Sequence, residues 1–335
     1  MMDLSVPYYE DFTRISNSNI GWFLNKGPAF LHKMLSGKGE EEKSAALTKG
    51  TMIHEYLLQP EEFQKDYVVW DKCRPASVQE EKFCQALTDS IEIEPNKALL
   101  SAYKAAYSVT GRSDDFIISA ASKKASVLKD YIDFKKSRDT RIMISPPQAL
   151  QLQKIKENIS KHKAASKLLK PADNEKVFHE FHINWQYVSY ENGKNSNLVC
   201  DCKSLLDSVT FDYDKKEITL MDLKTTSHLQ NFADAVNTYD YTRQLYYYTL
   251  ALNWYIINEL HDNEEWNFKW YIIAIDNTTS DIRVFEFDKD QIYYEKDNVD
   301  RVYNAINDIM WHKEHNLWEH SRAYYEGNGV EKLNL

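Results

Sequence analysis

The chain has 335 residues and a formal net charge of −10, because 51 acidic residues outnumber 41 lysines and arginines. This balance excludes a histone-like or tail-type nucleic-acid binder, although it is compatible with an enzyme that has a local basic groove. Hydrophobic residues make up 43% of the chain and charged residues 27%, which is typical of a globular protein and not of a disordered one.

The four cysteines are too few for a disulfide framework, and their spacing does not suit a zinc or iron–sulfur site. Cys200 and Cys202 alternate along an apparent strand, so we expect both to pack as small apolar groups. Residues 1–20 contain no apolar stretch of the signal-peptide type, and no run of 18 apolar residues occurs. We therefore expect a soluble, cytoplasmic protein.

The N-terminal half of the chain has mostly helical periodicity. Ser16 is typical of a helix N-cap, and Pro28 opens a short helix that should end near residue 35. The charged segment 37–43 is expected to be a loop. Further helices are expected over 45–58, 78–87, 97–107, 122–136 and 148–169.

From about residue 177 the pattern changes to strands separated by turns. The expected turns lie at 191–196 and 212–216. The expected strands span 177–190, 198–211, 217–224, 267–276 and 282–287. Helices are expected over 232–259 and 289–325. This order predicts an α/β or α+β domain with a mixed sheet and a helical N-terminal part.

The most informative segment is LMDLKTT at 220–226. Side chains alternate faces along a strand, so Asp222 and Lys224 point the same way. The carboxylate can bind a divalent cation, and the lysine can stabilise developing negative charge or help to position and deprotonate a water. The same Asp-x-Lys spacing occurs at residues 133, 201 and 214. An exposed strand pair would explain most such matches, but the apolar strand before Asp222 sets this one apart.

Asp207 lies on the strand that precedes Asp222. The turn predicted at 212–216 folds the two strands into a hairpin, which would bring the two carboxylates close together. Such carboxylates repel each other unless a cation lies between them. The alternative for Asp207 is a cap residue near the turn.

Two predicted helices carry further candidates. His54 shares a helix face with Gly50, and a neutral imidazole there can be a metal ligand, although a lone helical histidine is more often a core or surface residue. Gln244 and Tyr248 lie four residues apart on the aromatic helix, hence on one face. Arg243 and Tyr248 can contact phosphates, and the Gln244 amide can orient a metal-bound water or a strand.

In chain order, these motifs resemble the PD-(D/E)XK nuclease superfamily, and within it the RecB-type and exonuclease VIII-type branch, which is commonly phage-encoded. The similar segments are ISNSNI at 15–20, GPAF at 27–30, TKGTMIHEYLLQPEEF at 48–63, EFHINW at 180–185 and the Asp-x-Lys-Thr-Thr and Gln-x-x-x-Tyr motifs. The resemblance covers roughly 14–70 and 145–320. The chain departs from the family at Ser204, where a glycine is usual, and it lacks both the C-terminal iron–sulfur cysteines and a Walker A motif.

The resemblance implies a restriction-endonuclease-like α/β core, in which helices flank a mixed central sheet, within a single nuclease domain over 1–335. The catalytic core would span 146–325 together with the histidine motif at 45–60, and 71–145 would be a helical insertion. The implied metal ligands are His54, Asp207, Asp222 and the backbone carbonyl of Leu223. The implied catalytic residues are Lys224, Asp222 and Asp207, the implied DNA contacts are Gln244, Tyr248 and Arg243, and the implied supporting residue is Glu180.

The family further implies a Mg²⁺- or Mn²⁺-dependent exodeoxyribonuclease that degrades linear duplex DNA 5′ to 3′ for recombination in a phage or mobile element. The enzyme would assemble into a homo-oligomeric ring and would act together with a single-strand annealing protein. Positive potential would be confined to the DNA channel, with Lys224, Arg243 and the lysine-rich helix at 148–170 as candidates. The alternatives are an endonuclease, a single-strand-specific nuclease, a catalytically silent DNA-binding module on the same fold, and a structural protein with coincidental motifs.

Overall fold

The computed structural model describes residues 4–39, 45–92, 94–170, 172, 174–191 and 194–331, with the backbone alone at 45–47, 189–191 and 194–198. The chain forms two compact units. The first combines Met1–Pro60 with Gln153–Leu335, and the second is Glu61–Leu152. The loop predicted at 37–43 and the turn predicted at 191–196 fall partly outside the described residues.

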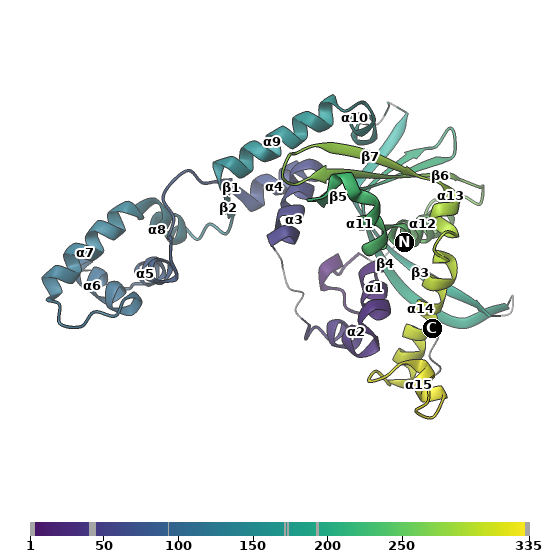
Figure 1. Ribbon diagram of the computed structural model, residues 1–335, viewed down its shortest axis with the longest axis horizontal. Helices are drawn as coiled ribbons and strands as arrows, with labels where there is room; N and C mark the ends of the chain where they lie inside the picture. The colour runs from purple at the N-terminus through teal and green to yellow at the C-terminus, as the bar shows by residue number, and fades with distance from the viewer. Residues whose placement is uncertain are drawn as a thin grey trace. The chain divides into compact units, whose positions relative to one another are not determined.

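The first unit is built on a five-stranded mixed sheet with the order β3-β4-β5-β6-β7 (Figure 1). The strands are β3 (Glu175–Glu191), β4 (Lys194–Asp212), β5 (Glu217–Thr226), β6 (Asn267–Asp276) and β7 (Ile282–Phe287). β5 and β6 run parallel, and the other neighbours pair antiparallel. The predicted mixed sheet with a helical N-terminal part is therefore confirmed.

Helices follow one another at the start of the first unit. They are η1 (Tyr8–Glu10), α1 (Asn17–Lys26), α2 (Pro28–Leu35), α3 (Ala45–Leu58) and, at the unit boundary, α4 (Pro60–Asp66). Ser16 caps α1, because its hydroxyl accepts from the backbone N–H of Asn19 while the Asn19 side chain accepts from the Ser16 N–H. Just before this cap, Ile15 forms a parallel bridge with Cys202 of β4. The N-terminal segment thereby covers a stretch of β4 that β5 does not reach.

The helix predicted over 232–259 is interrupted, and the structure corrects it to η2 (Leu229–Asn231), α11 (Phe232–Thr238) and α12 (Tyr241–Asn258). Asp240 between the two α-helices has a φ of 59°, in the left-handed region that a continuous helix does not contain. Helix α12 packs against β3 and β4 and supplies much of the core of this unit. Cys200 and Cys202 are buried in that core, as predicted.

The single helix predicted over 289–325 is also wrong. The structure has α13 (Lys289–Tyr293), α14 (Asn298–His315) and α15 (Arg322–Glu326). Asp297 and Asn316 flank α14 in left-handed conformations, with φ values of 50° and 53°, and so separate the three helices. None of the described helices combines the length and the apolar content that a membrane span needs.

The second unit contains the insertion predicted at 71–145 and has a small core of its own, formed around Phe83, Cys84 and Ala121. Its helices are α5 (Val78–Thr88), α6 (Pro95–Ala106), α7 (Asp114–Val127) and α8 (Lys129–Lys136), and α9 (Pro146–Lys161) leads back to the first unit, where α10 (Lys163–Leu169) follows. Strands β1 (Tyr67–Val69) and β2 (Ile142–Ile144) pair in parallel. The sequence does not predict these strands, because three residues are too few to establish a period.

Candidate metal centre

Three carboxylates lie in a row across β3, β4 and β5. On β3 and β4, Glu180 and Asp207 lie between the paired positions His179–Ser208 and Phe181–Leu206, without being paired themselves. The β4–β5 register sets Asp207 opposite Asp222, one step beyond the last paired position, which joins Ser208 to Met221. Opposite residues on neighbouring strands project to the same face, and the charge of Asp207 contributes to the raised pKa of Asp222. That the two aspartates share one ion stays a prediction.

Glu180 joins this row through an unusual backbone conformation. Its φ of 48° lies in the left-handed region, which residues with a side chain seldom adopt within a strand. Such strain persists only where the surrounding structure enforces it, and it is concentrated at functional sites.

The β4–β5 ladder ends at the pair of Ser208 with Met221, so Leu223, which lies beyond Met221 on β5, has no partner on β4. Two side chains take the place of the missing ladder bonds. The Leu223 N–H donates to Asp207 Oδ2 at 2.7 Å, and the Leu223 carbonyl lies 2.7 Å from His54 Nε2. A carbonyl only accepts, so in this arrangement Nε2 carries the proton.

Helix α3 delivers His54 to this point because Gly50 allows a close approach to β5. A Cβ added at Gly50 would lie only 3.2 Å from Thr225 Oγ1, tighter than ordinary van der Waals contact. His54 follows one helical turn later on the same face, and its Nδ1 lies 3.6 Å from Asp207 Oδ2. The absence of a side chain at Gly50 therefore lets α3 lie close to the Thr225 side chain of β5.

His54, Glu180 and Asp207 can hold a metal ion. Each offers one ligand atom, and these atoms all lie within 4.8 Å of one another. One imidazole nitrogen with carboxylate oxygens is a donor set that divalent cations accept. Glu180, expected only to support the site, thus lies among the candidate ligands. The ligand identities stay predictions, as does the identity of the metal.

Asp222 is not among the residues whose ligand atoms all lie within 4.8 Å of one another, but its own surroundings point to a cation beside it. Its side chain is 1% exposed, and neither carboxylate oxygen makes a well-aligned hydrogen bond among the described residues. Its charge partner is Lys224, whose Nζ lies 2.5 Å from Oδ2. A buried carboxylate is costly without full compensation, so a cation beside Asp222 would relieve it.

Burial and neighbouring charges shift the pKa values of Asp222, Glu180 and Lys224. Burial raises the pKa of Asp222, and Lys224 opposes this shift. Burial and the charges of Asp207 and Asp222 raise the pKa of Glu180 to about 8. For Lys224, burial lowers the pKa, but Asp222 and Asp207 outweigh it, so its pKa lies above the ordinary value. Lys224 is accordingly a fixed positive charge at neutral pH.

Helix α12 brings the predicted glutamine–tyrosine pair to this region. Gln244 Nε2 donates to the Tyr248 hydroxyl at 2.9 Å, as expected for residues on one helix face. Burial raises the pKa of Tyr248, and Asp222 and Asp207 contribute to the shift, so the tyrosine lies within their field. The role of the pair in binding DNA stays a prediction.

Arg243 has a different environment. Its side chain is buried, Nε donates to Asp240 at 2.8 Å, and Nη1 donates to the Asn17 side chain at 2.6 Å. Arg301 of α14 also binds Asp240, at 2.6 Å. These bonds tie α12 to α1 and α14 and favour a structural role for Arg243, although its predicted contact with DNA is not tested.

Sequence reasoning did not identify two neighbours of the row. The Tyr241 ring centroid lies 5.0 Å from Lys224 Nζ, and Glu55 adds to the raised pKa of Glu180. Tyr241 is three residues before Gln244, so the same-face argument that paired Gln244 with Tyr248 applies to it as well. Glu55 follows His54 directly, and its position in the sequence carries no comparable signal.

In the metal-free protein, Glu180 is expected to make the fold less stable as the pH rises. Its carboxyl has a pKa of about 8 in the fold against an ordinary value of 4.5, so the folded state holds the proton more tightly than the unfolded chain. This contribution is present below about pH 4.5 and is lost towards about pH 8, by on the order of 2 kcal/mol after allowance for partial exposure. Melting curves of wild type and Glu180→Gln in EDTA measure it. The same pH slope in both proteins would contradict the shift.

Comparison with known proteins leaves the family open. No family model matches the chain, and no curated protein matches it. A crystal structure from Eubacterium rectale named "Putative exonuclease" is similar over 100% of this chain and 96% of its own, with 13% identity and a TM-score of 0.48. The crystal structure of SSO0001 is similar over 68% of this chain and 83% of its own, with 12% identity and a TM-score of 0.26. Likeness at this level does not assign a function, which has to be inferred from the site itself.

Proposed function

We propose that the chain is a metal-dependent nuclease that hydrolyses phosphodiester bonds in linear duplex DNA. One observation carries this proposal: the ligand atoms of His54, Glu180 and Asp207 lie within 4.8 Å of one another, and the adjacent strand β5 carries the ion pair of the buried Asp222 with Lys224. Hydrolysis of a phosphodiester needs charge neutralisation, an activated water and a stabilised leaving group. A carboxylate cluster with one lysine meets these needs once it holds a hard cation.

The proposed ligands are His54, Glu180, Asp207, Asp222 and the Leu223 carbonyl, and the proposed ion is Mg²⁺ or Mn²⁺. When bound, such an ion neutralises charge on the scissile phosphate and makes a coordinated water more acidic. With the proton of His54 on Nε2, bound to the Leu223 carbonyl, Nδ1 is unprotonated and lies 3.6 Å from Asp207 Oδ2, so Nδ1 would be the nitrogen that binds the ion.

Lys224 would act as a positive charge rather than as a base. Asp222 and Asp207 keep its pKa above the ordinary value, so it does not release a proton at neutral pH. Its ammonium would stabilise the negative charge that develops on the phosphate. Of the two roles open to this lysine, charge stabilisation is therefore the one that its surroundings favour.

The family resemblance supplies the finer features of the proposal. These are exonuclease action from a free end, 5′ to 3′ polarity, a role in recombination in a phage or mobile element, a homo-oligomeric ring and a single-strand annealing partner. Gln244 and Tyr248 would contact the DNA strand next to the scissile bond.

A time course on linear and on covalently closed circular duplex DNA tests the proposal. With Mg²⁺ we expect loss of the linear DNA, survival of the circles, and no reaction in EDTA. Nicking of the circles would mean an endonuclease, and labels at the 5′ and 3′ ends would give the polarity. No cleavage of any DNA with Mg²⁺ or Mn²⁺ would refute the nuclease function.

A further inference from the structure

Several cationic side chains at the two ends of the central sheet differ in the groups that they contact. β5 and β6 run parallel, so their last residues, Thr226 and Asp276, lie at the same end. Lys224 and the candidate metal centre are close to that end. The opposite end is formed by Glu217 and Asn267, the first residues of the same two strands.

Around the metal-centre end, four cations bind neutral groups. Lys49 donates to the Asn277 carbonyl, Lys154 to the Thr279 carbonyl at 2.9 Å, and Arg283 to the Gln230 side chain at 2.7 Å. The fourth, Lys156, lies 5.6 Å from the ring centroid of Tyr56, on the helix that carries His54. Within the described part of the chain, none of the four forms an ion pair with a carboxylate, so no paired negative charge offsets theirs.

At the opposite end three lysines pair with carboxylates, whereas Lys176 and Lys289 lie over the rings of Phe178 and Tyr293. Lys215 pairs with Asp212 at 2.6 Å, Lys269 pairs with Glu217 at 2.8 Å, and Lys216 pairs with Asp262. A polyanion approaching this end would have to displace a carboxylate from each of these three lysines.

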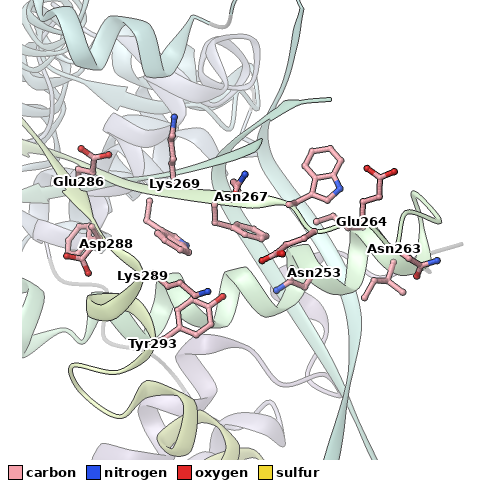
Figure 2. A pocket seen from close by; sticks show the side chains of 16 residues that line it. Asn253, Asn263, Glu264, Asn267, Lys269, Glu286, Asp288, Lys289 and Tyr293 are labelled. Carbon is pink, nitrogen blue, oxygen red and sulfur yellow. The ribbon is translucent and has the colours of Figure 1, made fainter. Parts of the chain in front are cut away.

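A pocket of about 480 Å³ lies at this opposite end, at the start of β6 and beside α13 (Figure 2). Two lysines, Lys269 and Lys289, line it. Four carboxylates also line it: Glu264, Glu265, Glu286 and Asp288. The pocket is acidic and far along the strands from Lys224, so it does not suit a nucleic acid.

Helices α9 and α10 extend the positive charge at the metal-centre end. Residues 154–170 contain six lysines and one glutamate, in a chain with a net charge of −10. The glutamate, Glu157, pairs with Lys161 at 2.5 Å. Ile155 and Ile159 are buried and mark the inner face of α9. Lys154 and Lys156 lie outside this face and are exposed.

We propose that Lys49, Lys154, Lys156 and Arg283 form a phosphate strip that binds the DNA backbone beside the metal centre. The inference rests on the proposed nuclease function and adds a location for substrate binding. Carbonyl, amide and ring contacts orient these cations without cancelling their charge, which suits them to attract phosphates. Lysine contacts to phosphate carry no sequence information, so the strip binds any duplex.

The test compares two double variants of the full chain. Lys154→Gln/Lys156→Gln removes two charges from the strip, and Lys269→Gln/Lys289→Gln removes two charges at the acidic pocket. All four side chains lie on the surface or at its rim, and circular dichroism and melting temperature verify that the fold is retained. Binding of a short fluorescent duplex is measured in EDTA, where metal-dependent cleavage does not interfere, over a series of salt concentrations.

We expect the strip variant to lose roughly tenfold in affinity at low salt, and the slope of log K against log salt to fall by about 2, since each phosphate contact contributes about 0.9. The control should bind like wild type. Unchanged affinity and slope in the strip variant, or equal losses in both variants, would overturn the inference. If wild type binds DNA through the strip but never cleaves it, the nuclease proposal fails while the strip stands. If wild type does not bind DNA at all, both fail.

Discussion

Replacement of Lys224 by methionine is expected to lower the rate of DNA hydrolysis by about 10³-fold or more. The substitution keeps the length and apolar stem of the side chain but removes the ammonium next to Asp222. A single cationic side chain that stabilises a reacting phosphate typically contributes about 10³-fold or more to the rate. Single-turnover cleavage of linear duplex with Mg²⁺ measures the effect, and Lys269→Met, at the far end of the sheet, serves as the control.

The same substitution leaves Asp222 buried without its charge partner, which should destabilise the metal-free fold by about 3–5 kcal/mol. The double variant Asp222→Asn/Lys224→Met removes both charges, so it should recover much of that stability while remaining inactive. This pattern separates a catalytic lysine from a merely structural one. Wild-type cleavage rates in either variant would refute the assignment of the site.

Asp207→Asn is expected to abolish activity and yet stabilise the metal-free protein, by on the order of 1 kcal/mol. Asparagine is nearly isosteric, and its side-chain oxygen can still accept from the Leu223 N–H, so the local bond survives. The substitution removes the central negative charge of the row, which relieves repulsion with Glu180 and Asp222. It also removes a proposed ligand, so Mg²⁺ should no longer raise the melting temperature.

Three measurements check this second prediction: the cleavage rate, the melting temperature in EDTA and its rise with Mg²⁺. Asp201→Asn is the matched control, because Asp201 is an exposed aspartate on the same strand. It should change none of the three. If Asp207→Asn kept the wild-type response to Mg²⁺, Asp207 would not be a ligand.

The helices show where local sequence patterns stop being sufficient. The breaks at Asp240 and Asp297 escape a reading of periodicity, because aspartate is tolerated within a helix and the apolar period continues across both positions. The left-handed conformation of Asp240 is accompanied by bonds to Arg243 and Arg301, the latter from a helix more than fifty residues away in the chain. Such a break depends on a distant partner and not on the residue itself.

The sequence by itself determined the strands of the central sheet and the shared face of Asp222 and Lys224. Both follow from a short-range rule, namely the two-residue period of a strand.

Only the tertiary structure decided which groups meet. The end of the β4–β5 ladder at Ser208 frees the Leu223 backbone for Asp207 and His54, and a left-handed Glu180 enters the candidate ligand set. The structure also decided which lysines pair with carboxylates. Lys49 binds a carbonyl 228 positions away in the chain, whereas Lys269 pairs with a carboxylate 52 positions away. No local pattern encodes these contacts, because each depends on how distant segments pack around the sheet.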